Sequence, residues 1–216
     1  MIRSLVERYP ELEQCSDDVW RAFEAMRATF AAGGKLLVCG NGGSAADADH
    51  LVGELMKGFV SRRPVGQATR QALSFAGAEE AAYLADHLQG ALPAISLASH
   101  GALATAVAND VAADMVFAQQ VHGYGRPGDT FLGISTSGNS LNVVRAAQVA
   151  RAAGLSVVGL TGASGGRLAG LCDVCVRVPY ATVVEVQERH LPVYHALSLM
   201  LEREFFPDAA AWLDVG

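Results

Sequence analysis

The sequence has 216 residues, of which 51% are hydrophobic and 18% are charged, and its formal net charge is −6. This length fits one domain with a core of its own, and a negative chain without a basic cluster is not expected to bind nucleic acid. No apolar run approaches the roughly 18 residues that cross a bilayer, so we expect no membrane partner. The opening residues lack the apolar stretch of a secretory signal, which predicts a cytoplasmic protein with reduced thiols.

From residue 35 onward, short apolar runs alternate with longer segments of helical periodicity. The apolar runs, which we interpret as buried strands, are residues 35–39, 93–98, 130–134, 155–160 and 174–178. The helical segments are residues 44–59, 102–108, 112–122, 140–153 and 165–171, with a last helix that reaches about residue 205. Because strands that are apolar on both faces alternate with helices, the sequence predicts an α/β fold with a doubly wound, five-stranded parallel sheet.

Two segments lie outside this alternation. Residues 1–33 carry apolar positions at helical spacing and predict one or two N-terminal helices, ahead of a main domain at residues 34–216. Residues 65–92 are too long for a simple connection between the first helix and the second strand. Because residues 78–88 within them have a helical pattern, we expect a helical insertion and not a structureless loop.

The first strand ends in a glycine-rich turn, CGNGGSAAD at residues 39–47, that leads into a helix. Gly40, Gly42 and Gly43 allow a sharp bend and the close approach of a ligand, and Ser44 is placed to cap the helix. A helix N-terminus has free N–H groups that attract anions, although an ordinary strand–helix turn has a similar composition. The turn lacks the GxGxxG spacing of a dinucleotide site.

A second turn, ISTSGNS at residues 134–140, also joins a strand end to a helix. Its four hydroxyl groups are those of Ser135, Thr136, Ser137 and Ser140. Hydroxyls and helix N–H groups together satisfy the oxygens of a phosphate without a cation. In open parallel sheets, ligands bind beyond the carboxyl ends of the strands, where both turns are expected. The two turns together predict a small phosphorylated ligand such as a sugar phosphate.

A third group of residues has side chains suited to catalysis or metal binding. His50 and Glu54 are four residues apart and share one face of the first helix. Such a pair can ligate one metal ion or share a proton-transfer site, but on spacing alone it is more often a surface hydrogen bond. Gln187 and His195 lie on the last helix, about 80° from a common face if that helix is straight. Pro192 between them is expected to kink it.

Cys172 and Cys175 have the CxxC spacing of redox and zinc sites. They fall in the apolar segment at residues 171–178, which looks like a buried strand, and residues three apart on a strand point to opposite faces. The sequence has no second CxxC to complete a zinc site. We therefore expect these thiols to be ordinary buried residues.

Taken together, these motifs resemble the phosphoheptose isomerases of the sugar isomerase (SIS) domain superfamily. The similarity rests on CGNGGSAADADH at residues 39–50 with Glu54, AND at 108–110, GRPGD at 125–129, GISTSGNS at 133–140, GLTG at 159–162, and VQERH at 186–190 with His195. The resemblance covers about residues 20–205. It implies the flavodoxin-like SIS fold and the isomerisation of D-sedoheptulose 7-phosphate to D-glycero-D-manno-heptose 7-phosphate, which supplies heptose biosynthesis.

The resemblance also implies roles for individual residues. The implied phosphate-binding residues are Ser135, Thr136, Ser137 and Ser140, and the implied sugar contacts are Asn41, Gly42, Ser44, Asn109, Asp110 and Gln187. It implies a Zn²⁺ ion held by His50, Glu54, Gln187 and His195, with Glu54 and His195 as the catalytic pair of an enediol mechanism. It also implies a homotetramer with active sites near subunit interfaces.

Three features depart from the family pattern. Residues 182–186 and the pair Ser99-His100 differ from the usual family residues near the expected sugar hydroxyls, and the insertion at 65–92 is longer than usual. The insertion is interpreted as a lid or as an added interface contact. The roles of His100 and His190 are left open, with packing favoured for His190.

Two alternative functions remain beside the isomerase. One is a non-catalytic SIS protein that binds a phosphosugar or a protein partner, and the other is an isomerase of a related sugar phosphate. Non-catalytic relatives tend to lose the Glu and His of the site, whereas Glu54 and His195 are present here. The sequence therefore favours an enzyme.

Overall fold

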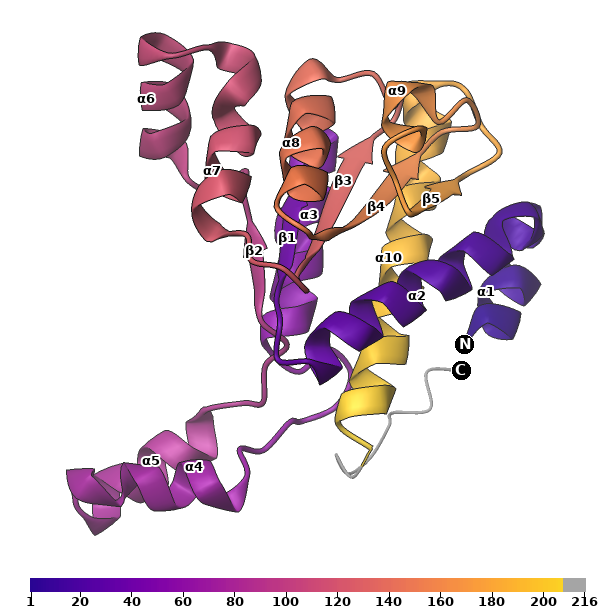
Figure 1. Ribbon diagram of the computed structural model, residues 1–216. Helices are drawn as coiled ribbons and strands as arrows, with labels where there is room; N and C mark the ends of the chain where they lie inside the picture. Colours follow the sequence, from indigo (N-terminus) through magenta and orange to yellow (C-terminus); the bar gives the residue numbers. More distant parts are fainter. Residues whose placement is uncertain (208–216) are drawn as a thin grey trace.

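The computed structural model describes residues 1–207, and Figure 1 shows a sheet with helices on both faces and a helical arm that extends away from it. The strands are β1 (Leu36–Cys39), β2 (Ala94–Ser96), β3 (Thr130–Ser135), β4 (Ser156–Thr161) and β5 (Val174–Arg177). The α-helices are α1 (Ile2–Arg8), α2 (Ser16–Ala31), α3 (Gly43–Met56), α4 (Gln67–Ala72), α5 (Ala78–His87), α6 (Gly101–Asp110), α7 (Val116–Tyr124), α8 (Leu141–Ala152), α9 (Gly166–Ala169) and α10 (Val183–Phe205). The 3₁₀ helices are η1 (Pro10–Cys15), η2 (Leu73–Ala76) and η3 (Ala113–Met115). None of the helices in residues 1–207 is long and apolar enough to cross a membrane.

The strands form one parallel, five-stranded sheet in the order β2-β1-β3-β4-β5. In the centre of the sheet, Leu37 of β1 pairs with Ile95 of β2 on one side and with Phe131 of β3 on the other. The chain adds β2 on one side of β1 and the later strands on the other, so the strand order reverses between β1 and β3. This confirms the predicted doubly wound fold and places its ligand-binding crevice at that point.

Each face of the sheet has its own apolar core, because successive strand residues point to opposite faces. Leu36 and Val38 face a core that also contains Met26 of α2 and residues of α3 and α10. Leu37 and Phe131 face a second core formed with α7, α8 and α9. The predicted N-terminal helices thus share the first core with the sheet, and the boundary at residue 33 stays a prediction.

The helix predicted at residues 44–59 ends earlier, at Met56. The last carbonyls of a helix lack partners within it, and here the side chain of Arg63 supplies donors for two of them. Its Nη1 donates to the Leu55 carbonyl at 2.7 Å and its Nη2 to the Glu54 carbonyl at 2.9 Å. The chain therefore turns back after Met56 instead of adding another helical turn.

The same guanidinium group forms a buried ion pair with α10. Arg63 Nε donates to Glu202 Oε1 at 2.8 Å, and both side chains are 0% exposed. The Glu202 carboxylate also accepts hydrogen bonds from the backbone N–H groups of Phe59 and Val60, at 2.8 and 3.1 Å. This network joins the end of α3 to α10, the two helices that carry the predicted catalytic residues.

The insertion at residues 65–92 is helical, as predicted, and forms the arm in Figure 1. Its elements α4, η2 and α5 pack on one another, and a bridge between Pro64 and Gln89 closes the base. Ala85 is the one buried residue in these elements, whereas Phe75 and Tyr83 are 86% and 59% exposed. Helices this short are marginal without tertiary packing, so we expect another surface to cover the arm.

Candidate functional site

Both predicted ligand turns lie at the carboxyl ends of neighbouring strands. The glycine turn follows β1 and the hydroxyl turn follows β3, on either side of the point where the strand order reverses. The side-chain amides of Asn41 and Asn142 exchange two hydrogen bonds of 2.9 Å between the first turn and the start of α8. The structure thus brings the two turns into one site, where a sheet of this order binds its ligand.

The glycine turn bends sharply, but Ser44 does not cap α3 as predicted. Gly42 is the N-cap residue, with a φ of +56° that side-chain-bearing residues rarely adopt. Ser44 lies inside the first helical turn and is buried. A Cβ atom at Gly43 would lie 2.4 Å from Nε2 of Gln187. Glycine at this position therefore lets the predicted ligand Gln187 reach the start of α3.

The hydroxyl turn joins the last residue of β3, Ser135, to the N-cap residue of α8, Ser140. The Ser135 hydroxyl donates to the Ser140 hydroxyl at 3.1 Å, and the Ser137 hydroxyl accepts from the Asn139 N–H at 3.1 Å. The Ser140 side chain makes no capping hydrogen bond, which leaves the helix N-terminus open to an anion. Together with Thr136, these groups have the composition of a phosphate-binding loop.

His50, Glu54 and His195 come together between α3 and α10. His50 Nε2 lies 3.1 Å from Glu54 Oε1, and the ring centroids of His50 and His195 are 5.0 Å apart. The Glu54 side chain is only 12% exposed, so this pair is not an isolated surface hydrogen bond. Helix α10 continues through Pro192 as one helix; Gln187 meets α3 at Gly43, whereas His195 lies beside His50, about two turns further along.

Two residues behind His50 were not predicted from the sequence. The hydroxyl of Tyr194, a residue only 1% exposed, lies 3.0 Å from His50 Nδ1 and 3.3 Å from Asp47 Oδ1. An ionised Asp47 can only accept, so the hydroxyl donates to Asp47 and accepts from the His50 Nδ1–H group. His50 Nε2 then directs a lone pair at Glu54. In this arrangement His50 Nε2 and Glu54 Oε1 are both acceptors, 3.1 Å apart. Such a contact requires a proton or a metal ion between the two atoms.

Burial is the main cause of the shifted pKa values in this cluster. It raises the pKa of Asp47, while the Tyr194 hydrogen bond and the charge of His50 act in the opposite direction. Burial also lowers the pKa of His195, with a further lowering by His50 and an opposing effect of Glu54. His195 is therefore a neutral imidazole at neutral pH, able to accept a proton or to ligate a metal.

The predicted metal ligands fit Zn²⁺ in their chemistry, since imidazole and carboxylate are common zinc donors. Glu54 Oε2 and His195 Nε2 are buried without a hydrogen-bond partner; the Lys57 ammonium is 3.8 Å from Glu54 Oε2, beyond hydrogen-bond distance. Among residues 1–207, however, no group of three His, Cys, Asp or Glu side chains has the spacing of a formed metal site. The residue types thus suit zinc, although their side chains are not arranged as a formed metal site. Zinc binding stays a proposal.

Asn109 and Asp110, predicted to contact the sugar, lie exposed at the end of α6. The Asn109 amide donates to the Asp110 carboxylate at 2.7 Å, and α6 packs on α7 and η3. In the part of the chain that the structure describes, no hydrogen bond joins them to the His50 cluster. Their role as sugar contacts stays a prediction.

The sequence analysis also raised His190, His100 and the segment at 182–186, and each lies in a different environment. His190 is fully buried on α10 and burial lowers its pKa to about 4, in agreement with a packing role. The His100 ring lies 5.6 Å from the Tyr124 ring. Thr182 caps the start of α10: its Oγ1 accepts from the Glu185 N–H at 3.4 Å, and its hydroxyl donates to the Glu185 carboxylate at 2.6 Å. That part of the unusual segment at 182–186 therefore starts the helix that carries the site.

Comparison with known proteins decides the family. The SIS domain family model matches residues 2–85 and 72–162. The chain is 40% identical, over 191 residues and 88% of each chain, to the phosphoheptose isomerase of Rhodospirillum rubrum. The chain belongs to the phosphoheptose isomerase family. Another phosphoheptose isomerase, from Nitratidesulfovibrio vulgaris strain Hildenborough, is 40% identical over 201 residues, which cover 92% of this chain and 84% of that one.

Solved structures of phosphoheptose isomerases have the same fold. The enzyme of Neisseria gonorrhoeae superimposes with a TM-score of 0.72 at 32% identity, over 93% of this chain and 94% of that one. The enzyme of Francisella tularensis superimposes with a TM-score of 0.75 at 30% identity and the same coverage. The resemblance drawn from the motifs and the predicted SIS fold are therefore confirmed.

Because Tyr194 holds the orientation and tautomer of His50, its hydroxyl matters to this phosphoheptose isomerase. Tyr194→Phe keeps the ring and removes only that hydroxyl. We expect kcat to fall about 10–100-fold, the usual cost of losing the hydrogen-bond partner that orients a functional histidine, with little change in KM. Tyr83→Phe on the exposed arm is the control. Equal kinetics for Tyr194→Phe and the wild type would show that the hydroxyl plays no part.

Proposed function

We propose that the chain isomerises D-sedoheptulose 7-phosphate to D-glycero-D-manno-heptose 7-phosphate. The observation that carries the proposal is the convergence of His50, Glu54 and His195 on two helices whose neighbouring turns suit a phosphate. The substrate is supported by relatives named phosphoheptose isomerase at 34–41% identity. The cytoplasmic location expected from the sequence belongs to the same proposal.

Each group has a distinct task in this reaction, which moves a proton between C1 and C2 through an enediol. The hydroxyl turn and the N-terminus of α8 bind the phosphate and fix the position of the sugar. The Glu54 carboxylate removes the proton from one carbon and returns it to the next. His195, neutral before the reaction, exchanges a proton with the two oxygens as they gain and lose charge. Tyr194 keeps His50 in place beside this pair.

We propose that a single Zn²⁺ ion per subunit binds to His50, Glu54, Gln187 and His195. The unpartnered Glu54 Oε2 and His195 Nε2 atoms and the contact between two acceptors at His50 support it. When bound, the ion would polarise the sugar carbonyl as a Lewis acid. Calorimetric titration of zinc into the metal-free chain is expected to give one site in the wild type and none in His50→Ala. Equal zinc binding by the wild type and by His50→Ala would show that the ion does not bind at this site.

We propose a homotetramer, in which a neighbouring subunit covers apolar side chains that the single chain leaves exposed. Phe75 and Tyr83 on the arm, Val111 after α6 and Val184 on α10 are each more than half exposed. The arm leaves the body beyond the C-terminal end of α3, whereas the glycine turn lies at the N-terminal end. This placement favours an interface role for the arm over a lid.

Deleting residues 67–87 tests the arm without disturbing the bridge between Pro64 and Gln89 at its base. We expect light scattering to give a smaller assembly at the same subunit concentration, with KM for the sugar phosphate nearly unchanged. A raised KM in an assembly of unchanged size would identify a lid instead. Unchanged size and KM would contradict both interpretations of the insertion.

Turnover of sedoheptulose 7-phosphate tests the function. The purified chain is incubated with this ketose, with added zinc or with a chelator, and aldose formation is followed. We expect aldose in both cases and more of it with zinc. Turnover of a pentose or hexulose phosphate in its place would identify an isomerase of a related substrate. Tight binding without turnover of any of them would identify a non-catalytic SIS protein.

A further inference from the structure

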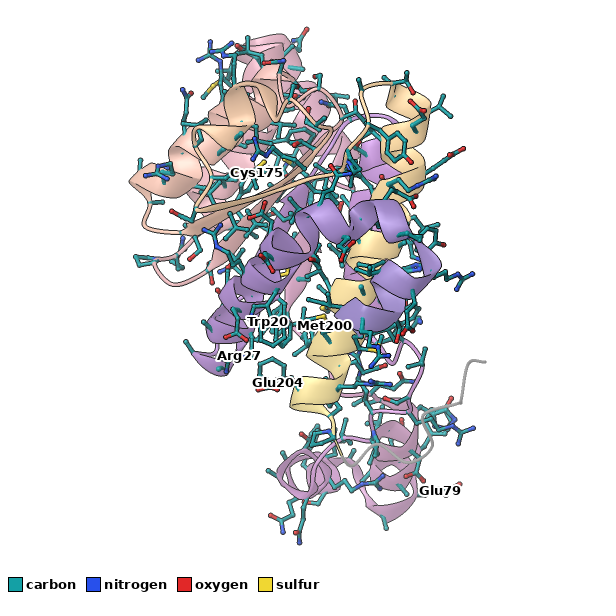
Figure 2. The ribbon with its side chains drawn as sticks, turned by 90° about the vertical axis from the view of Figure 1, so that its right-hand side faces the viewer. Trp20, Arg27, Glu79, Cys175, Met200 and Glu204 are labelled. Carbon is teal, nitrogen blue, oxygen red and sulfur yellow. The ribbon has the colours of Figure 1, made fainter. Side chains whose placement is uncertain are left out.

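The two cysteines of the CxxC segment lie side by side, contrary to the prediction that they point to opposite faces. Strand β5 begins at Val174, so Cys172 lies in the turn before the strand and the alternation of a strand does not apply to it. A Cβ atom at Gly159 of β4 would lie 2.7 Å from Cys172 Sγ and 3.2 Å from Cys175 Sγ. Both sulfur atoms therefore occupy the space over Gly159. Figure 2 shows Cys175 in the body of the molecule, remote from Glu79 on the arm.

Hydrogen bonds fix the turn that carries the pair. The Asp173 N–H donates to the Val157 carbonyl at 2.8 Å, and the Val157 N–H donates to Asp173 Oδ2 at 2.8 Å. Arg21 Nη2 donates to the Asp173 carbonyl at 3.1 Å, and the Cys172 thiol donates to the Leu168 carbonyl at 3.2 Å. The backbone on both sides of Asp173 is thus held in place, so the approach of the two sulfur atoms is part of the fold.

The two thiols differ in acidity from each other and from the remaining cysteines. The neighbouring Cys172 thiol lowers the pKa of Cys175 to about 7, while the same contact raises the pKa of Cys172. Both are partly exposed, whereas Cys15 and Cys39 are buried with raised pKa values. A thiol whose pKa is close to the ambient pH is the most effective attacking group in disulfide exchange. Cys175 is therefore the reactive cysteine of the chain.

We propose that Cys172 and Cys175 form a redox-active dithiol, which a small-molecule disulfide oxidises to an intramolecular disulfide. The Cys175 thiolate attacks one sulfur of the small disulfide, forms a mixed disulfide and releases one thiolate. Cys172 then gives its proton to solvent, attacks Cys175 Sγ and releases the second thiolate. The chain loses two electrons in total, and the small disulfide is reduced to two thiols.

A zinc half-site is the competing interpretation of the same spacing. Zinc sites of structural type use four ligands, and in residues 1–207 no third His, Cys, Asp or Glu completes a metal-binding group with these thiols. The carboxylate between them, that of Asp173, already accepts the Val157 N–H. The contacts therefore favour exchange chemistry at this pair.

Peptide mapping tests the proposal without reference to enzymatic activity. The wild-type chain is equilibrated in buffers of reduced and oxidised glutathione, alkylated, and cleaved with trypsin. Residues 168–177 form one tryptic peptide that contains both cysteines of the pair and neither of the others. We expect this peptide to become unalkylated and lighter by two hydrogen atoms, at glutathione ratios that leave Cys15 and Cys39 reduced. A peptide that stays doubly alkylated, or carries two glutathione groups, would overturn the proposal.

Single substitutions test the order of the two steps. In Cys172→Ser the second step is blocked, so Cys175 is expected to accumulate one glutathione as a mixed disulfide. In Cys175→Ser the attacking thiolate is missing, and Cys172 is expected to react much more slowly. Cys15→Ser is the matched control and should leave the internal disulfide intact. Faster glutathione addition to Cys172 than to Cys175 would overturn the assigned order.

Discussion

Replacing Glu54 by glutamine is expected to lower kcat about 10²–10⁴-fold, the usual contribution of a positioned acid or base. The amide has nearly the same shape as the carboxylate but cannot remove the carbon-bound proton. The turns proposed to bind the phosphate lie at the strand ends and are untouched by this change, so KM should stay close to the wild-type value. Steady-state kinetics with sedoheptulose 7-phosphate measures both quantities.

Two further variants show whether this effect is specific. Glu188→Gln makes the same chemical change on α10 at an exposed carboxylate next to Gln187, and should retain wild-type kinetics. His195→Ala should lower kcat by a factor similar to that of Glu54→Gln, since each residue handles one of the two proton transfers. Equal activity of Glu54→Gln and Glu188→Gln would exclude Glu54 as the base.

Replacing Arg63 by alanine is expected to lower the free energy of unfolding by about 3–5 kcal/mol, the cost of leaving one charge of a buried pair alone. Glu202 would lose its ionic partner, and the carbonyls of Leu55 and Glu54 would lose their donors. Urea unfolding at fixed protein concentration measures the loss. Because Arg63 also fixes the end of α3, kcat should fall in the fraction that remains folded.

Arg62 offers a matched control at the adjacent position. It is exposed, so Arg62→Ala should change the free energy of unfolding by no more than about 0.5 kcal/mol. Similar losses for Arg62→Ala and Arg63→Ala would contradict a structural role for the buried pair. A large loss confined to Arg63→Ala would support it.

The sheet and the two turns could be predicted because their signals are local. Apolar runs flanked by glycine and hydroxyl residues indicate buried strands that end at ligand-binding turns, and the strand predictions match the structure to within a residue or two. The motifs shared with phosphoheptose isomerases then predicted Glu54 and His195 as the catalytic pair. Their approach across α3 and α10 depends on tertiary packing, which spacing along the chain does not contain.

Two of the missed features depend on contacts between distant residues. Arg63 follows Arg62 in the sequence as an ordinary basic pair, yet its partner Glu202 lies at the far end of the chain. Tyr194 adjoins a predicted site residue, but its hydrogen bonds to Asp47 and His50 require that α3 and α10 lie side by side. The expectation that Cys172 and Cys175 point to opposite faces was wrong because the whole apolar run at 171–178 was treated as strand, whereas β5 begins at Val174.

A second surface, apart from the arm, exposes apolar side chains to solvent. Figure 2 shows Trp20, Arg27, Met200 and Glu204 gathered between α2 and α10, where they line an open groove. Trp20 is half exposed there. Together with the arm, this surface gives the proposed tetramer apolar area to bury.

The most direct test of proton transfer by Glu54 and His195 is to follow sedoheptulose 7-phosphate by nuclear magnetic resonance in D₂O with the wild-type chain. Isomerisation through an enediol predicts an aldose signal, and exchange of the proton held by Glu54 with D₂O adds deuterium at C2 of the aldose and, by reversal, at C1 of the ketose. Glu54→Gln should show none of these changes on the same timescale. A wild-type chain that binds the ketose, forms no aldose and leaves its C1 hydrogens in place would contradict the account.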